Sequence, residues 1–209
     1  MKTAEKQDKR QNILAVAEKL FSEQGFEGTS TRQIAKEAGA NMAMINYYFG
    51  GKEGVFTEIL SKRIEHFNPL LRSISEEQAP TLEKLFHMVE GYVRRIMSNM
   101  AFHRMMQREV SLIQRPEIYN RIKEAMIANL TVLEDMIDKG IDSGEFRQVD
   151  VKMLIATMLG TVTNVVMFPF RITNGTDLDI NVPKDAELIA NRLVAHLKEI
   201  MTTYLTPQK

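Results

Sequence analysis

Hydroxyl, amide and phenol groups are concentrated in residues 29–49, where the spacing of apolar residues predicts two short helices joined by a tight turn. Ser30 and Thr31 can cap the first helix, because a hydroxyl at a helix start accepts from amides that lack a partner inside the helix. Gly39 can adopt the positive φ angle of a helix end, and Asn41 can cap the second helix. Such groups on a short exposed helix suit hydrogen bonding to a nucleic acid.

The second of these helices has an inner and an outer face. Ile45 and Phe49 are four residues apart and point inward. Six residues then lie outside or at the edges: Met42, Ala43, Met44, Asn46, Tyr47 and Tyr48. Methionine and alanine can contact thymine methyl groups, and asparagine can pair with adenine. The stretch predicts a helix-turn-helix with the recognition helix second, although spacing alone also fits a plain helical hairpin with an aromatic core.

Two segments around this motif carry a family resemblance. They read G-F-E-G-T-S-T-R-Q-I-A-K-E-A-G-A (residues 25–40) and I-N-Y-Y-F-G-G-K-E-G-V-F (residues 45–56). The sequence from Arg10 to Leu60 resembles the N-terminal domain of the TetR/AcrR family of bacterial transcriptional regulators. One position departs from the family, where the residue before Tyr47 is often tyrosine and is Asn46 here.

We expect the DNA contacts to divide into two groups. Thr31 and Lys52 should hold phosphates, assisted by Arg32, Tyr47 and Tyr48. Phosphate contacts fix the position of a protein on the duplex, whereas sequence is read at the base edges. The bases should therefore be met by Met42, Ala43, Met44 and Asn46.

Composition bounds the class of protein. Of 209 residues, 44% are hydrophobic and 26% charged, and the formal net charge is zero, so any nucleic-acid-binding face must be local. Residues 1–52 hold eight Lys or Arg against six Asp or Glu, a slight positive bias. The absence of cysteine excludes disulfides, thiolate metal sites and cysteine catalysis. No apolar run suits a membrane span and no signal peptide is evident, so we expect a cytoplasmic protein.

Helical spacing continues along the rest of the chain, which predicts an all-α fold of about nine helices. We expect a DNA-binding domain at residues 1–52 and a larger effector-binding and dimerisation domain at residues 53–209. The helix that begins at Lys52 keeps its apolar stripe through Pro69, where a kink is expected. The other expected helices are Arg10–Gln24, the two of the motif, Thr81–Met97, Phe102–Ile113, Glu117–Lys139, Asp150–Thr173 and Asp185–Leu205.

The helix from Asp150 is apolar over most of its circumference, so one layer of the same domain would not cover it. Burial against a second subunit, together with the last helix, predicts a homodimer with Val162 and Leu193 in the seam. The resemblance implies the same, since family members dimerise through their last two long helices. A central helix buried within a monomer is the alternative.

Methionine is concentrated after residue 80, where 11 of the 14 lie. Methionine is flexible and lines cavities for varied apolar ligands, although it also fills gaps in ordinary cores. The resemblance implies a small-molecule effector in a pocket between the C-terminal helices. The candidate lining residues are Phe86, Tyr92, Met97, Phe102, His103 and Met106.

Catalytic and metal chemistry find no support. No histidine pair or histidine–carboxylate set has metal-ligand spacing, and nothing assembles a nucleophile, a base and an oxyanion site, so we expect no enzyme and no cofactor. The sequence predicts a homodimeric repressor that an effector releases from a palindromic operator in double-stranded DNA. Two alternatives are a DNA-binding or architectural protein controlled by a protein partner, and an all-α enzyme that contains a helical hairpin.

Overall fold

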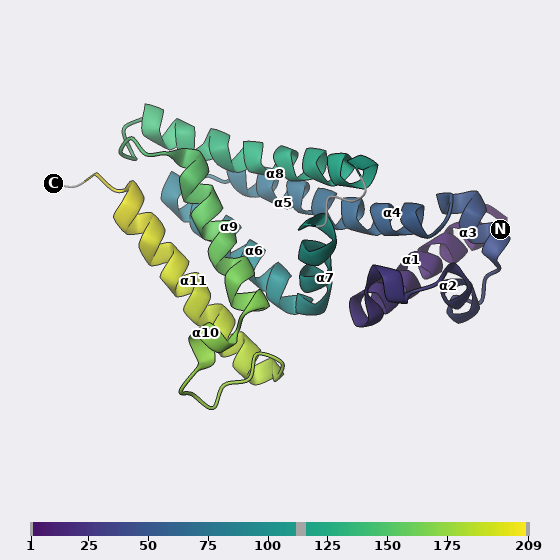
Figure 1. Cartoon of the computed structure of the whole chain (residues 1–209). Coiled ribbons are helices and arrows are strands. Elements are labelled where there is room, and N and C mark those ends of the chain that lie inside the picture. Colours follow the sequence, from purple (N-terminus) through teal and green to yellow (C-terminus); the bar gives the residue numbers. More distant parts are fainter. Residues whose placement is uncertain (1, 112–115, 208–209) are drawn as a thin grey trace. The chain divides into compact units, whose positions relative to one another are not determined.

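The computed structural model describes residues 2–111 and 116–207, which form helices and no strand (Figure 1). The expected all-α fold class is confirmed. The helices are α1 (Lys2–Gly28), α2 (Thr31–Glu37), α3 (Met42–Phe49), α4 (Lys52–Glu65), α5 (Phe67–Ser75), α6 (Thr81–Ser98), α7 (Met100–Ser111), α8 (Pro116–Asp142), α9 (Val151–Met167), α10 (Phe170–Thr173) and α11 (Pro183–Leu205). The expected end of one helix at Ile113 lies outside the described residues.

The first helix is longer than expected, because helical structure begins at Lys2 instead of Arg10. Gly25 interrupts it with φ 75° and ψ 173°, a conformation that glycine adopts without a Cβ clash. The interruption lets Phe26 fold back on the preceding turn, where its ring stacks on Phe21 with centroids 5.6 Å apart. Phe56 of α4 meets the Phe26 ring edge-on at 4.8 Å, so three aromatic rings join α1 to α4.

The long helix expected from Lys52 through Pro69 is interrupted at one residue, His66, whose φ of −63° and ψ of −15° stay in the right-handed helical region, and helical structure continues through Pro69 as expected. α4 ends at Glu65 and α5 begins at Phe67. Proline has no N–H to donate to the carbonyl four residues earlier, and its ring clashes with that carbonyl. For Pro69 that carbonyl belongs to Glu65, which is where α4 stops. The proline therefore acts three residues upstream, as a helix break at His66.

The chain forms two compact units. The first comprises residues 1–66 and 101–126, and the second comprises residues 67–100 and 127–209. The chain passes between them at His66, at Met100 and within α8 after Met126. These units are defined by contacts within the chain. The expected boundary near residue 53, between the DNA-binding domain and the effector-binding domain, is a functional division and stays a prediction.

The core of the first unit is shared by helices from both of its segments. Ile13, Phe21, Ile34 and Ile45 are fully buried in it and come from α1, α2 and α3. Three further members come from α7 and α8: Phe102, Met105 and Ile122. The helices of the DNA-binding motif therefore share one apolar core with α7 and the first part of α8.

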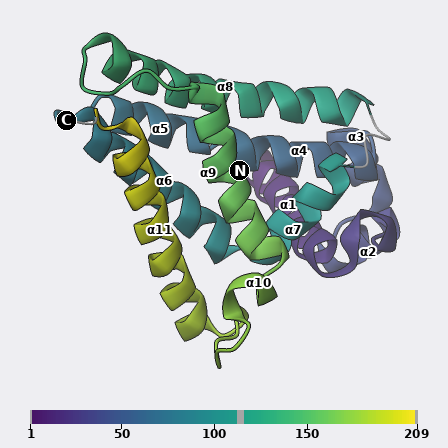
Figure 2. The ribbon, with the colours of Figure 1, turned by 60° about the vertical axis from the view of Figure 1, so that its left-hand side comes forward.

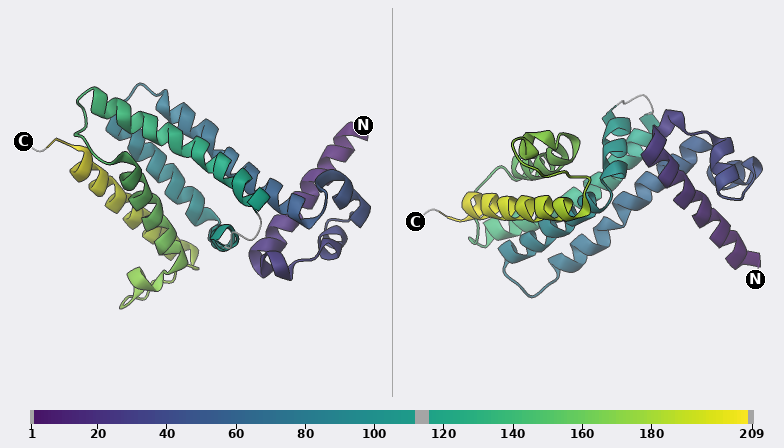
Figure 3. Two further views of the ribbon diagram at one scale, coloured as in Figure 1. Left: turned by 45° about the horizontal axis from the view of Figure 1, so that its top comes forward. Right: turned by 90° about the horizontal axis from the view of Figure 1, so that it is seen from below.

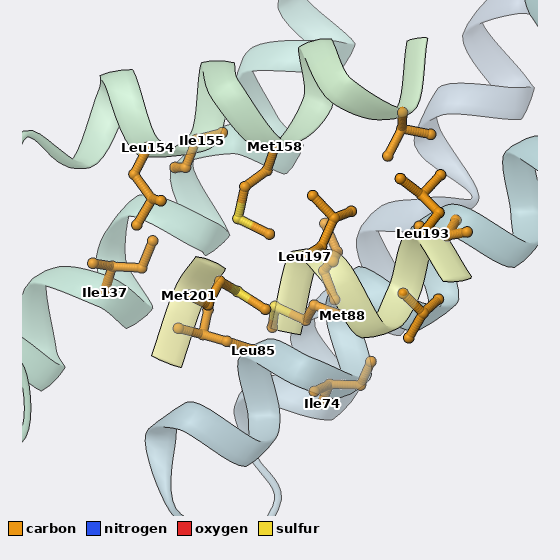
Figure 4. Packing of buried hydrophobic residues seen from close by; sticks show 14 of the residues in the cluster. Ile74, Leu85, Met88, Ile137, Leu154, Ile155, Met158, Leu193, Leu197 and Met201 are labelled. Carbon is orange, nitrogen blue, oxygen red and sulfur yellow. The ribbon is translucent and has the colours of Figure 1, made fainter. Parts of the chain in front are cut away.

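The second unit packs α6, α9 and α11 around a core rich in methionine. Figure 4 shows Met158 of α9 directed toward Leu197 of α11, with Met88 of α6 beneath them. Figure 2 shows α9 and α11 side by side, with α10 in the connection that joins their ends. α5 and α8 also lie side by side (Figures 1 and 3), where Asn68 Nδ2 donates to the Ala128 carbonyl at 3.0 Å.

Two residues that we expected in a dimer seam belong to the core of the subunit itself. Val162 is completely buried within the chain, and Leu193 is 5% exposed. Both α9 and α11 carry apolar residues on more than one side, and helical spacing alone does not say which side meets the subunit's own α6. The assignment of these two residues to a seam is therefore wrong.

Candidate nucleic-acid interface

The geometry of α2, the turn and α3 follows from local capping. The Ser30 hydroxyl accepts from the Gln33 amide at 3.1 Å, and the Asn41 carboxamide oxygen accepts from the Met44 amide at 2.8 Å. Gly39 lies between the two helices with φ 56°, in the left-handed region that favours glycine. The capping roles predicted for Ser30 and Asn41 are confirmed, and Thr31 is the first residue of α2 instead of its cap.

α3 presents a polar and apolar outer surface to solvent. Its inner residue Ile45 is completely buried, whereas Met42 is 47% exposed and Tyr47 is 73% exposed. Ala43 and Asn46 are also exposed. Met44 and Tyr48 are half-buried, and the Tyr48 ring lies between those of Tyr47 and Phe49. The exposed set matches the size and chemistry of a recognition helix.

Contacts from α1 and α4 fix the far end of α3. The Arg10 guanidinium lies 5.0 Å from the centroid of the Phe49 ring and donates to Glu58 of α4 at 2.5 Å. Lys62, one turn along α4, is 2.9 Å from the same carboxylate. Burial alone would raise the pKa of Glu58, but hydrogen bonds from Lys62 and Arg10 outweigh it and hold the pKa below its ordinary value. Glu58 therefore stays ionised and links α1 to α4 beneath the motif.

Lys52 has a structural role that its position in the sequence did not indicate. Its ammonium donates to the Phe26 carbonyl at 2.8 Å and lies 4.1 Å from the centroid of the Phe26 ring. An ammonium group has three donors, so one contact leaves hydrogens for a phosphate. Thr31 is half-buried and Arg32 is exposed, both in the first turn of α2. The phosphate contacts of these three residues stay predictions.

The six residues expected to line an effector pocket divide between the two units. Phe86, Tyr92 and Met97 lie on α6 at the margin of the methionine-rich core. The other three lie on α7 in the first unit: Phe102, His103 and Met106. The six residues therefore belong to two different units. A pocket formed by all six stays a prediction.

Two of these six residues have strongly shifted pKa values. Burial raises the pKa of the Tyr92 phenol to about 12. The hydrogen bond with Thr163 and the charge of Arg95 both lower this pKa, but burial outweighs them. His103 is 2% exposed, and burial, with a smaller effect from Arg104, lowers its pKa to about 4. His103 is therefore a neutral core residue at neutral pH.

Metal-binding clusters and membrane-spanning helices are both absent from the described residues. No group of three or more His, Cys, Asp or Glu side chains in residues 2–111 and 116–207 is arranged to hold a metal ion. Within the same part of the chain, no helix combines the length and apolar character that crossing a bilayer requires.

Comparison with known proteins gives consistent matches along the chain. Residues 13–59 match the family of bacterial regulatory proteins called the tetR family, and residues 78–167 match a tetracyclin repressor-like C-terminal domain. The fatty acid metabolism regulator protein of Bacillus subtilis is 24% identical over 165 residues, covering 78% of this chain and 84% of that protein. The HTH-type transcriptional regulator AcrR of Shigella flexneri is 30% identical over 138 residues, covering 58% and 64%.

A solved structure supports the fold over nearly the whole length. The crystal structure of the transcriptional regulator FadR from Bacillus subtilis in complex with stearoyl-CoA has a TM-score of 0.72 at 22% identity, covering 90% of this chain and 96% of that one. At this identity the structural similarity establishes the fold alone, whereas the two domain matches establish the family. With an exposed, capped recognition helix and both characteristic domains in order, the chain belongs to the TetR family of bacterial DNA-binding transcriptional regulators.

Proposed function

We propose that the protein is a homodimeric repressor that a small-molecule effector releases from a palindromic operator. The observation that carries this proposal is the outer face of α3, where Met42, Ala43, Asn46 and Tyr47 are exposed while Ile45 is buried. Two copies of such a helix, held by one dimer, match two half-sites related by twofold symmetry.

The outer sides of α9 and α11 support the dimeric part of the proposal. Met153 on α9 is 61% exposed, and Ala156 and Gly160 follow it on the exposed side. On α11, Leu188 and Ala195 are exposed. Small residues let a partner helix approach closely, and exposed apolar side chains favour burial by a second subunit.

A long-chain acyl-CoA is the effector class that we propose. The B. subtilis FadR structure contains stearoyl-CoA, and the B. subtilis relative regulates fatty acid metabolism. In this chain, Met88, Met158 and Met201 are buried in the core of the second unit, where flexible thioethers can adjust to an alkyl chain. The hydrogen-bonded hydroxyls of Tyr92 and Thr163 add a polar site at its margin.

DNA fragments selected from a random library by the purified protein should reveal a palindromic site. Asn46→Ala should then cost about 1–3 kcal/mol per half-site and weaken the preference at one position of each half, because the amide would no longer pair with a base. A selected sequence that is unchanged in the variant would exclude base reading by Asn46.

Operator release is tested by adding stearoyl-CoA, below its micelle-forming concentration, to the protein bound to fluorescent operator DNA. We expect about a 5- to 150-fold loss of operator affinity, the range of typical allosteric coupling. Coenzyme A without an acyl chain and decanoyl-CoA serve as controls for the headgroup and the chain length. Tight operator binding that no acyl-CoA alters would favour control by a protein partner, and failure to select any DNA would overturn the proposal as a whole.

A further inference from the structure

Lys9 of α1 lies against the turn between α2 and α3. A Cβ atom placed on Gly39, in that turn, would be 3.7 Å from the Lys9 ammonium nitrogen. Asn12, about one helical turn further along α1, donates from its side chain to the Ala38 carbonyl at 2.9 Å. These two contacts place the N-terminal part of α1 over the turn and bring a positive charge beside the start of α3.

Lys9 and its neighbour Arg10 are both cations, but they differ in the partners that surround the charge. Arg10 is occupied by Glu58 and the Phe49 ring. Among the described residues, Lys9 forms no hydrogen bond or ion pair, and its side chain is half-buried beside an exposed glycine. The carboxylate of Glu37, at the end of α2, accepts from Gln33. The Lys9 ammonium is therefore a cation held near the motif without a described anionic partner.

We propose that Lys9 is a phosphate contact of the DNA-binding unit, outside the helix-turn-helix itself. When the outer face of α3 lies in the major groove, the turn at its N-terminus lies beside the wall of the groove, which is sugar and phosphate. An ammonium over this turn can reach a phosphate oxygen as a point charge, with no demand on the base sequence. The inference rests on DNA binding through α3 and extends the interface to a third helix.

The test compares Lys9→Gln with Lys19→Gln. Lys19 is an exposed lysine on the same helix, so the control removes the same charge away from the turn. The affinities of both variants for the selected operator and for a random duplex are measured by fluorescence anisotropy at several salt concentrations. Lys9→Gln should reduce the slope of log K against log salt by about 0.9 per subunit and weaken binding about eightfold per subunit at 0.1 M salt.

Two further measurements separate this role from others. The loss should be equal on operator and random DNA, and Lys9→Arg should restore it, because the contact reads charge alone. The unfolding midpoint in urea should be the same for both glutamine variants. A salt slope equal to that of Lys19→Gln would overturn the proposal, as would a loss that is confined to the operator or matched by lower stability. Absence of DNA binding by the wild-type protein would instead overturn the proposed function and this inference together.

Discussion

Lys52 has one contact that the structure shows and a second that we predict. Its ammonium joins the start of α4 to the end of α1 through the Phe26 carbonyl and the Phe26 ring. The phosphate contact that we expect would be a second role for the same cation. The two roles have different signatures, because one contributes to the free energy of unfolding and the other to the salt dependence of DNA binding.

Lys52→Ala should therefore change both quantities. We expect the free energy of unfolding to fall by about 1–3 kcal/mol, from the lost charged hydrogen bond and the lost cation–π contact. The slope of log K against log salt should also fall by about 0.9 per subunit. Urea unfolding and a salt series measure the two effects, with the exposed Lys36→Ala as a control for loss of charge. An unchanged salt slope would leave Lys52 with the structural role alone.

His103 makes the stability of the protein depend on pH. Its pKa is about 4 in the folded chain and about 6.5 in the unfolded chain, so between these values the unfolded chain binds more protons. Stability is therefore lost as the pH falls through this window. We expect a loss of about 2 kcal/mol between pH 7 and pH 5 from this residue. Urea unfolding of wild type and His103→Gln measures it, and an equal pH dependence in both would contradict the prediction.

At the scale of elements, the break between α4 and α5 lies where the chain leaves the first unit. Pro69 explains the break, since the Glu65 carbonyl receives no hydrogen bond from residue 69. We propose that this break is the place where a change in the second unit alters the setting of α4. A ligand shifts such an equilibrium only through different affinities for its two states.

Pro69→Ala should let residue 69 donate to the Glu65 carbonyl and favour one continuous helix over residues 52–75. We expect the ratio of effector affinities with and without operator DNA to change, while the fold is retained. Calorimetric titration of stearoyl-CoA in both conditions measures this ratio for wild type and variant. Pro80→Ala is the matched control, because Pro80 precedes the first turn of α6, where no intrahelical donor is needed. An identical ratio in all three proteins would exclude a role for the break in coupling.

At the scale of the whole molecule, what the sequence predicts depends on distance along the chain. The caps at Ser30, Asn41 and Asp150 involve residues three positions apart, so local rules identify them. Arg10 and Glu58 are 48 positions apart, and no local pattern pairs them. The covered side of α11 likewise depends on α6, so helical spacing alone does not place Leu193 in the core of the subunit. Among the site residues, helical spacing correctly separated exposed Met42 and Tyr47 from buried Ile45.

The proposed dimer gives a test with two substitutions on the same helix. Ala195 is exposed in the subunit, so Ala195→Arg should leave the fold intact and separate the dimer, because an unpaired charge in a buried seam costs several kcal/mol. Leu193→Arg should instead unfold the subunit, since Leu193 is in its core. Sedimentation velocity and circular dichroism distinguish the outcomes. A folded Ala195→Arg protein that still sediments as a dimer would place the seam elsewhere.

The core that α7 and the first part of α8 share with the DNA-binding helices has a consequence for the design of chimeric regulators. A chimera that transplants only residues 1–66 leaves behind Phe102, Met105 and Ile122, three buried members of the core of that unit. The hybrid would expose the apolar surface that these side chains cover, unless its new host supplied side chains of similar volume at the same places. A graft that keeps the DNA-binding unit of this protein intact must therefore carry residues 101–126 as a second, separate insert.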